Sequence, residues 1–114
     1  MWGSSSQIYY FADRPMATRF AFCNYQTGKI WDSWAAAVDA GDTSTFVVPQ
    51  SWPELLEDLD SEPPAFIVDA AAGGLAMFDR HPLTRYPELA ARVKGRYRIA
   101  AVVDRIPIYE RQAR

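Results

Sequence analysis

Asp69 is the residue of this chain whose position best suits chemistry, because it ends the apolar stretch PPAFIVD (63–69) just before a loop of small residues. Ligands of open α/β sheets gather at the carboxyl ends of strands, so an acid there could bind a ligand or exchange a proton. A carboxylate in this place can also cap a loop or pair with an arginine. We favour a structural or recognition role and keep Asp69 as a candidate binding residue.

Other catalytic chemistry has few residues to use. His81 is the only histidine, so a Cys–His or Ser–His pair would need it, and in DRHPL it is predicted to lie in a surface loop. Cys23 is the only cysteine, which excludes an internal disulfide and a CxxC motif. The acidic cluster EDLDSE (57–62) is expected on the solvated face of a helix, and the acids lack metal-ligand spacing. We therefore predict no catalytic residue, metal or cofactor in this chain.

Aromatic and basic residues gather in the first twenty positions. Four of them are further candidate binding residues: Trp2, Tyr10, Arg14 and Arg19. Surfaces that bind sugars or single-stranded nucleic acids combine aromatic rings with arginines in this way. Packing in the core is the alternative explanation for the aromatic residues.

Charge is divided unevenly along the chain, although the net charge is only −2. Residues 1–78 carry three basic residues against ten acidic ones, whereas residues 79–114 carry nine basic against four acidic. Basic residues of 92–98 could face phosphate groups of lipids or of nucleic acid, but we favour a solvated face and expect no nucleic-acid partner. With 49% hydrophobic residues and no apolar run near the ~20 residues of a membrane span, the composition is that of an ordinary globular domain.

Three segments place apolar residues at i, i+3, i+4 and i+7, the pattern of an amphipathic helix, and they begin at Trp31, Trp52 and Tyr86. Gly41 and Gly95 are expected to end the first and the third of these helices.

The starts of these helices also carry signals. Ser51 followed by Glu54 predicts a capping box, and Thr84 is the expected N-cap of the third helix. A shorter helix is expected over 5–13. Its inward-facing residues are predicted to be Ile8, Phe11 and Ala12.

Strands are expected at 65–69, 97–104 and 106–111, with two more at 20–23 and 45–48. The continuous apolar run of 65–69 indicates a strand covered on both faces. The last two strands are close enough to form a hairpin, and Pro107 favours an edge position for the final one. Helices that alternate with strands predict a single α/β domain over 1–114, with a small mixed sheet, about four flanking helices and a closing β-hairpin.

Four segments, taken in order, are similar to one family. They are WG (2–3) with Tyr10, RPMATRF (14–20), PAFIVD (64–69) and YER (109–111). Together they resemble the C-terminal extracytoplasmic domain of bacterial membrane glycosyltransferases of family 39, the relatives of protein O-mannosyltransferases and of lipid A aminoarabinose transferases. Two departures are Arg105, where the family commonly has a hairpin glycine, and the lack of a strand leading into Trp2.

The resemblance implies a parent enzyme at the periplasmic face of the bacterial inner membrane, which transfers a sugar from a polyprenyl phosphate to a lipid or protein acceptor. It implies that this chain is an excised, non-catalytic soluble domain that recognises the acceptor or packs on the membrane domain of its own protein, near the membrane surface. The family's catalytic acids lie in membrane-domain loops, so none is carried over. A free-standing carbohydrate- or small-ligand-binding module, or an interaction module, is the alternative.

Overall fold

The computed structural model describes residues 1–29 and 43–113. In this part of the chain, four α-helices accompany three strands. The elements are α1 Gln7–Ala12, α2 Asn24–Thr27, α3 Ser51–Ser61, β1 Phe66–Val68, α4 Pro87–Arg96, β2 Tyr97–Val103 and β3 Ile106–Arg111. Short 3-10 turns lie at Ser44–Phe46, Leu75–Met77 and Leu83–Arg85.

The sheet has the order β1-β3-β2, and both pairings are antiparallel. Ile67 of β1 lies opposite Tyr109 of β3, which in turn lies opposite Ile99 of β2. One isolated parallel bridge adds Trp2 beside Asp69 at the end of β1. The predicted α/β domain with flanking helices and a closing hairpin is therefore confirmed, and among the described residues parallel pairing is confined to that bridge.

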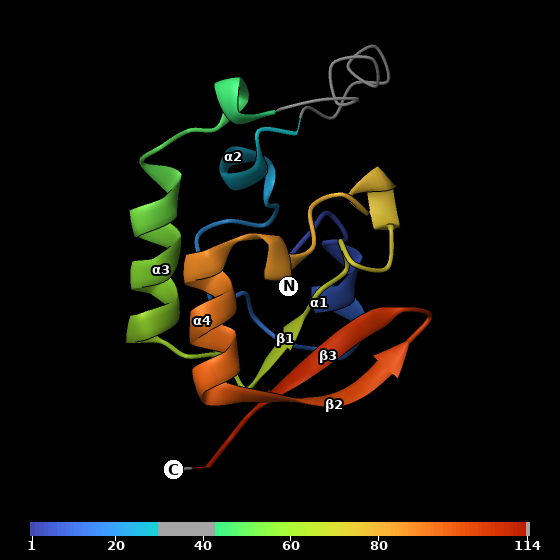
Figure 1. Cartoon of the computed structure of the whole chain (residues 1–114). Helices are drawn as coiled ribbons and strands as arrows, with labels where there is room; N and C mark the ends of the chain where they lie inside the picture. Colours follow the sequence, from blue (N-terminus) through green and yellow to red (C-terminus); the bar gives the residue numbers. More distant parts are fainter. Residues whose placement is uncertain (30–42, 114) are drawn as a thin grey trace.

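The helices and the sheet form a compact unit with a radius of gyration of 13.7 Å, close to the ~13 Å typical of 100 residues. Figure 1 shows α3 and α4 side by side, with the β2–β3 hairpin extending away from them and α1 near β1 and β3. Buried residues from α3, α4 and the sheet belong to one core, which includes Leu55, Ile67, Leu89, Val93 and Tyr109.

The two long helices follow the predicted periodicity. α3 buries Leu55 and Leu56, and α4 buries Leu89 and Val93. The predicted helix that begins at Trp31 lies outside the described residues.

Helix ends differ from the sequence prediction. The Ser51 hydroxyl donates to the carbonyl of Val48 at 2.7 Å instead of accepting from the helix, so the capping box is absent. Thr84 lies within the 3-10 turn before α4, and the helix starts with Pro87, whose missing N–H costs nothing at a first helical position. α4, the third helix predicted from the sequence, also continues through Gly95 to Arg96. β2 begins at the next residue, so no glycine cap is needed there.

The N-terminal helix is shorter than predicted and faces outward. α1 has no buried residue, and Phe11 is 81% exposed. The prediction that Phe11 and Ala12 face inward is wrong, because a helix of six residues has too few turns to bury a continuous stripe.

Two predicted strands are not strands. Residues 21–23 form bends and residue 20 has no regular structure, and the Cys23 N–H donates to the carbonyl of Gly3 rather than to a ladder. Residues 44–46 form a 3-10 turn in which the Phe46 N–H bonds the carbonyl of Thr43. These backbone groups form their hydrogen bonds outside a sheet, so the apolar side chains alone do not make strands.

Strand positions within the sheet also correct the sequence prediction. β3, which contains Pro107, is the central strand and not an edge. The Asp69 N–H still donates to the Pro107 carbonyl at 3.0 Å, but proline has no N–H to return the bond, so the β1–β3 ladder ends there. β1 is an edge strand, and only Ile67 of its three residues is buried, so the expected cover on both faces is wrong.

Leu89→Ala is expected to lower the free energy of unfolding by about 2–5 kcal/mol, because Leu89 is buried in the core on α4. Urea denaturation followed by circular dichroism would measure it. Val102→Ala, on the exposed hairpin, should change the same free energy by less than about 0.5 kcal/mol. Equal stability of the two variants would contradict the packing of α4.

Candidate functional site

A cavity of about 700 Å³ lies beside β1. Its walls come from α1 and the segment that follows it, from α3, from residues 62–68 and from β3. The lining is predominantly apolar and includes Ile8, Met16, Leu59, Phe66 and Ile108. A pocket of this volume is in the range of small-molecule sites, which makes it the main candidate site of the described chain.

Trp2 joins the N-terminal segment to the edge of β1. The Trp2 N–H donates to the carbonyl of Val68 at 2.7 Å, and the Ala70 N–H donates to the carbonyl of Trp2 at 2.9 Å. The indole N–H donates to the carbonyl of His81 at 2.8 Å, and the ring lies 5.9 Å from Trp52. Trp2 is thus a buried anchor that also contributes to the lining of the cavity.

Gly3 permits this close approach. Its φ is +120°, and a Cβ there would lie 2.8 Å from the backbone nitrogen of Ala71. Only glycine fits both the backbone conformation and the space, which gives the WG pair a physical reason.

Asp69 is almost fully buried, and its carboxylate accepts two backbone hydrogen bonds, from Ala72 at 3.0 Å and from Leu83 at 2.9 Å. Burial raises the pKa of Asp69, while the hydrogen bonds oppose that rise. The side chain therefore ties the loop after β1 and the turn before α4 to the strand end.

His81 is buried, which corrects the predicted surface loop. Its Nδ1 lies 2.9 Å from the hydroxyl of Tyr86 and 3.4 Å from the guanidinium of Arg85. Arg85 ends the turn at Leu83–Arg85 and Tyr86 follows it, so this turn places both partners at the ring nitrogen. The imidazole is a structural element of this loop.

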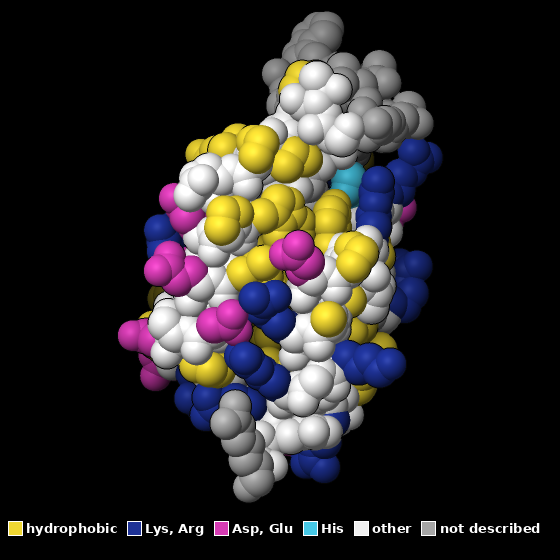
Figure 2. Space-filling model, turned by 60° about the vertical axis from the view of Figure 1, so that its left-hand side comes forward, with side chains coloured by type: hydrophobic (Ala, Val, Ile, Leu, Met, Phe, Trp, Pro, Cys, Tyr) yellow, Lys and Arg dark blue, Asp and Glu magenta, His cyan; other side chains and the backbone are white. Residues whose placement is uncertain are grey.

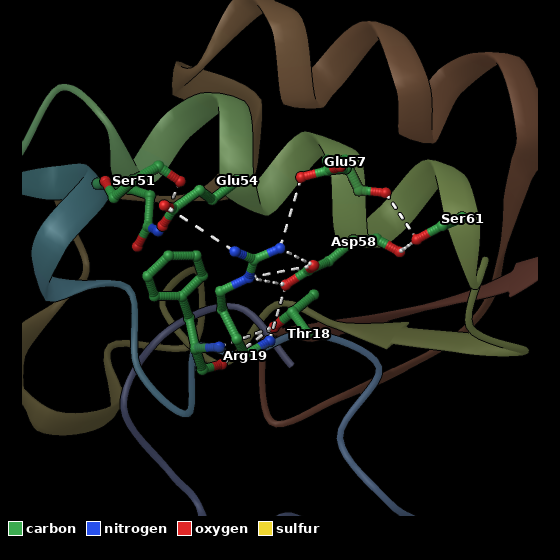
Figure 3. Close-up of polar contacts among 9 residues, drawn as sticks. Thr18, Arg19, Ser51, Glu54, Glu57, Asp58 and Ser61 are labelled. Carbon is green, nitrogen blue, oxygen red and sulfur yellow. Dashed lines mark hydrogen bonds and ion pairs between the residues drawn. The ribbon is translucent and has the colours of Figure 1, made fainter.

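Arg19 links the segment 14–20, which lines the cavity, to acidic side chains of α3, as Figure 3 shows. Its Nε and Nη2 both reach the carboxylate of Asp58, the latter at 2.7 Å, and its backbone N–H donates to the same group at 2.8 Å. Glu54 and Glu57 lie 3.9 and 3.5 Å from the guanidinium. These bonds hold the pKa of Asp58 below its usual value.

Glu57, Asp58 and Asp60 of the acidic cluster at 57–62 are therefore paired with arginines and not merely solvated, which corrects the sequence interpretation. Asp60 bonds Arg92 at 3.1 Å and Arg96 at 2.8 Å, and the pKa of Asp60 is lowered by them. Figure 2 shows the α3–α4 face, where acidic and basic side chains alternate around an apolar patch. Arg98, farther along the chain, pairs with Glu110 on the hairpin.

The five candidate binding residues do not form one constellation. Trp2 and Asp69 meet at the end of β1, and Arg14 lies on the cavity rim in the same segment as Arg19. Tyr10 is 82% exposed and packs edge-to-face on Phe11.

The sequence prediction missed the cavity and its apolar walls, such as Ile8 and Met16. The available signal was the continuous apolar run at 65–69, because it places apolar side chains on both faces of the strand.

Nucleophilic and metal chemistry find little support in the described residues. Burial raises the pKa of the Cys23 thiol to about 12, so it stays protonated at neutral pH. Within 1–29 and 43–113, no group of three or more His, Cys, Asp or Glu side chains could hold a metal ion.

Comparison with known protein families, with curated proteins and with solved structures finds no match to this chain.

Asp69→Asn is expected to lower the free energy of unfolding by about 1–3 kcal/mol at pH 7, because the amide turns a donor toward one of the two backbone N–H groups. Asp104→Asn, in the exposed β2–β3 turn, is the matched control and should have little effect.

The pH dependence gives the same test a second readout. Because the pKa of Asp69 is raised on folding, its contribution to stability is greatest below its ordinary value of 3.8 and falls as the pH rises above it. The Asn variant should lack this decline. An unchanged pH profile would contradict a buried, titrating Asp69.

Arg19→Lys is expected to speed amide hydrogen exchange over residues 16–22 by roughly twofold to fivefold, because lysine keeps the charge but loses the planar fork to Asp58. Arg98→Lys, whose partner is Glu110, should leave the exchange of that segment unchanged. If both variants behave alike, Arg19 does not anchor the cavity wall.

Proposed function

We propose that this chain is a non-catalytic accessory domain of a membrane glycosyltransferase, which transfers a sugar from a polyprenyl phosphate to a lipid or protein acceptor at the extracytoplasmic face of the membrane. In this proposal the cavity-bearing side of the domain packs against the rest of the enzyme. Recognition of the acceptor is the second role open to the same side.

The observation that carries the proposal is that the four segments of the family resemblance lie together in space. Residues 64–69 contain β1, which pairs with the strand that contains 109–111. Trp2 bonds the end of β1, and 14–20 lines the cavity next to it. Segments far apart in the sequence thus contribute to one site, which is the arrangement expected of a shared functional surface.

The character of the cavity favours packing over catalysis or sugar binding. Its lining is mainly apolar, whereas a sugar needs several convergent hydrogen-bonding side chains. The alternative of a carbohydrate-binding module therefore has less support. The charged side chains of Asp58 and Asp60 are engaged with arginines of the same domain.

Proximity to a membrane surface is part of this proposal, although the arginines give it limited support. Arg92, Arg96 and Arg98 are all paired with acids of this chain, which reduces the charge they can present to anionic headgroups. Among the helices described, none is long and apolar enough to cross a bilayer.

The test uses the whole reading frame that contains this chain, expressed in bacterial membranes. We expect that frame to encode several apolar spans of about 20 residues. Phe66→Asp should reduce sugar transfer from polyprenyl-phosphate donors by about tenfold or more, since an ionised side chain on the packing surface must be desolvated.

Two controls accompany this assay. Val102→Asp, on the exposed hairpin, should leave transfer unchanged. Phe66→Asp in the 114-residue chain should still fold, because Phe66 is already 44% exposed there. A frame without apolar spans, or transfer that is insensitive to Phe66→Asp, would refute the proposal.

A further inference from the structure

Gln26 carries a buried hydrogen-bond acceptor that no described residue satisfies. The residue belongs to α2 and is 1% exposed. Its Nε2 donates to the carbonyl of Ser51 at 3.3 Å, which fixes the nitrogen end of the amide on α3. The other end, Oε1, is buried and has no hydrogen-bond partner in the described part of the chain. Leaving a buried amide oxygen without a donor costs free energy, so a partner from outside the chain is expected.

The surroundings of Gln26 hold the amide in this position. The backbone carbonyl of Gln26 accepts from the indole N–H of Trp52 at 3.2 Å, which ties α2 to α3. The Ser51 hydroxyl is not the missing donor, because it already donates to the carbonyl of Val48. The unsatisfied oxygen therefore belongs to a fixed part of the structure.

Gln26 also lines the cavity beside β1. Ser4 and Asn24 each have a buried side-chain oxygen without a partner, but neither residue belongs to the lining. A bound water would need about two to four polar partners, and a predominantly apolar lining offers few of them. The unsatisfied acceptor and the cavity thus point to the same ligand.

We infer that the cavity binds a small apolar molecule with one neutral hydroxyl group, which donates to Oε1 of Gln26. A cavity of about 700 Å³ is large enough for such a molecule, and its predominantly apolar lining favours an apolar body. Aromatic side chains on the walls would pack well against a ring in the ligand. The aromatic lining residues are Trp2, Tyr9, Phe20, Phe22 and Phe66.

The charges of the lining favour a hydroxyl over a charged donor. Arg14, Glu62 and Arg111 are the charged lining residues, and all three are exposed. An ammonium group could also donate to Oε1, but it would lose its hydration without a buried carboxylate in the lining to pair with. A sugar would bring several hydroxyl groups and leave most of them unpaired. The inference is argued from the 114-residue chain alone and does not rest on the proposed function.

The experiment titrates the 114-residue chain with octylphenol and with its methyl ether, which has a similar shape but no donor, and follows binding by NMR chemical shifts. We expect the phenol to bind about tenfold or more tightly than the ether, because a site that hydrogen-bonds a hydroxyl rejects an analogue without it. Intermolecular NOEs should connect the phenol ring with the side-chain amide of Gln26.

Gln26→Leu removes the acceptor and keeps a similar volume. This variant should bind the phenol about tenfold or more weakly than the unaltered chain does and should bind the phenol and the ether equally. Gln50→Leu is the matched control, since Gln50 is exposed and lies outside the lining, and it should keep the preference for the phenol. Circular dichroism checks that both variants fold. If Gln26→Leu does not fold, the NOEs and the comparison of phenol with ether in the unaltered chain decide.

Three results would overturn the inference. The first is no binding of the phenol up to its solubility limit. The second is equal binding of phenol and ether to the unaltered chain, which would show that no donor is recognised. The third is a preference for the phenol that persists in Gln26→Leu, which would place the hydroxyl at another residue. Each of these results leaves the transfer assay of Phe66→Asp intact, so the ligand site and the proposed function are tested separately.

Discussion

The short parallel bridge between Trp2 and the end of β1 is the interaction on which the rest of this structure depends. Two backbone hydrogen bonds place Trp2 beside Asp69, and the indole N–H then reaches the carbonyl of His81. The same bridge brings the N-terminal segment alongside β1 and so creates the cavity between them. Gly3 makes the contact possible, because a side chain there would collide with the backbone at Ala71.

Many charged side chains of this domain form ion pairs with one another. The acids of α3 lie between Arg19 on one side and Arg92 with Arg96 on the other. The acidic first two-thirds and the basic last third of the sequence are thereby brought together. Exposed pairs of this kind contribute little stability, but they orient the segments that they join. The segment that carries Arg19 lines the cavity, so the orientation of this segment matters more than the energy of the ion pair.

Prediction from sequence succeeded where the pattern is local. The periodicity of α3 and α4 and the short turn between β2 and β3 identify elements whose bonds lie within a few residues of each other. Prediction from sequence failed where the structure depends on three-dimensional contacts rather than on a local pattern. His81 is buried and its ring nitrogen lies at the hydroxyl of Tyr86, and Pro107 occupies a central strand because the β1 ladder ends there. For the candidate site, the sequence pointed to Asp69 and Trp2 but not to the apolar cavity between them and α1.

The sequence by itself determined the fold class, the absence of an internal disulfide and the amphipathic helices, because composition and periodicity set which surfaces must be buried. Only the tertiary structure decided which groups are left without partners. The Phe66 N–H and C=O and the Val68 N–H point away from β3 and have no hydrogen bond to the described residues, yet in the sequence Phe66 and Val68 look like residues of any buried strand. Whether these groups have hydrogen-bonding partners depends on which edge of β1 pairs with β3 and on which groups of β1 the Trp2 backbone bonds. No local sequence pattern encodes which strand lies next to which.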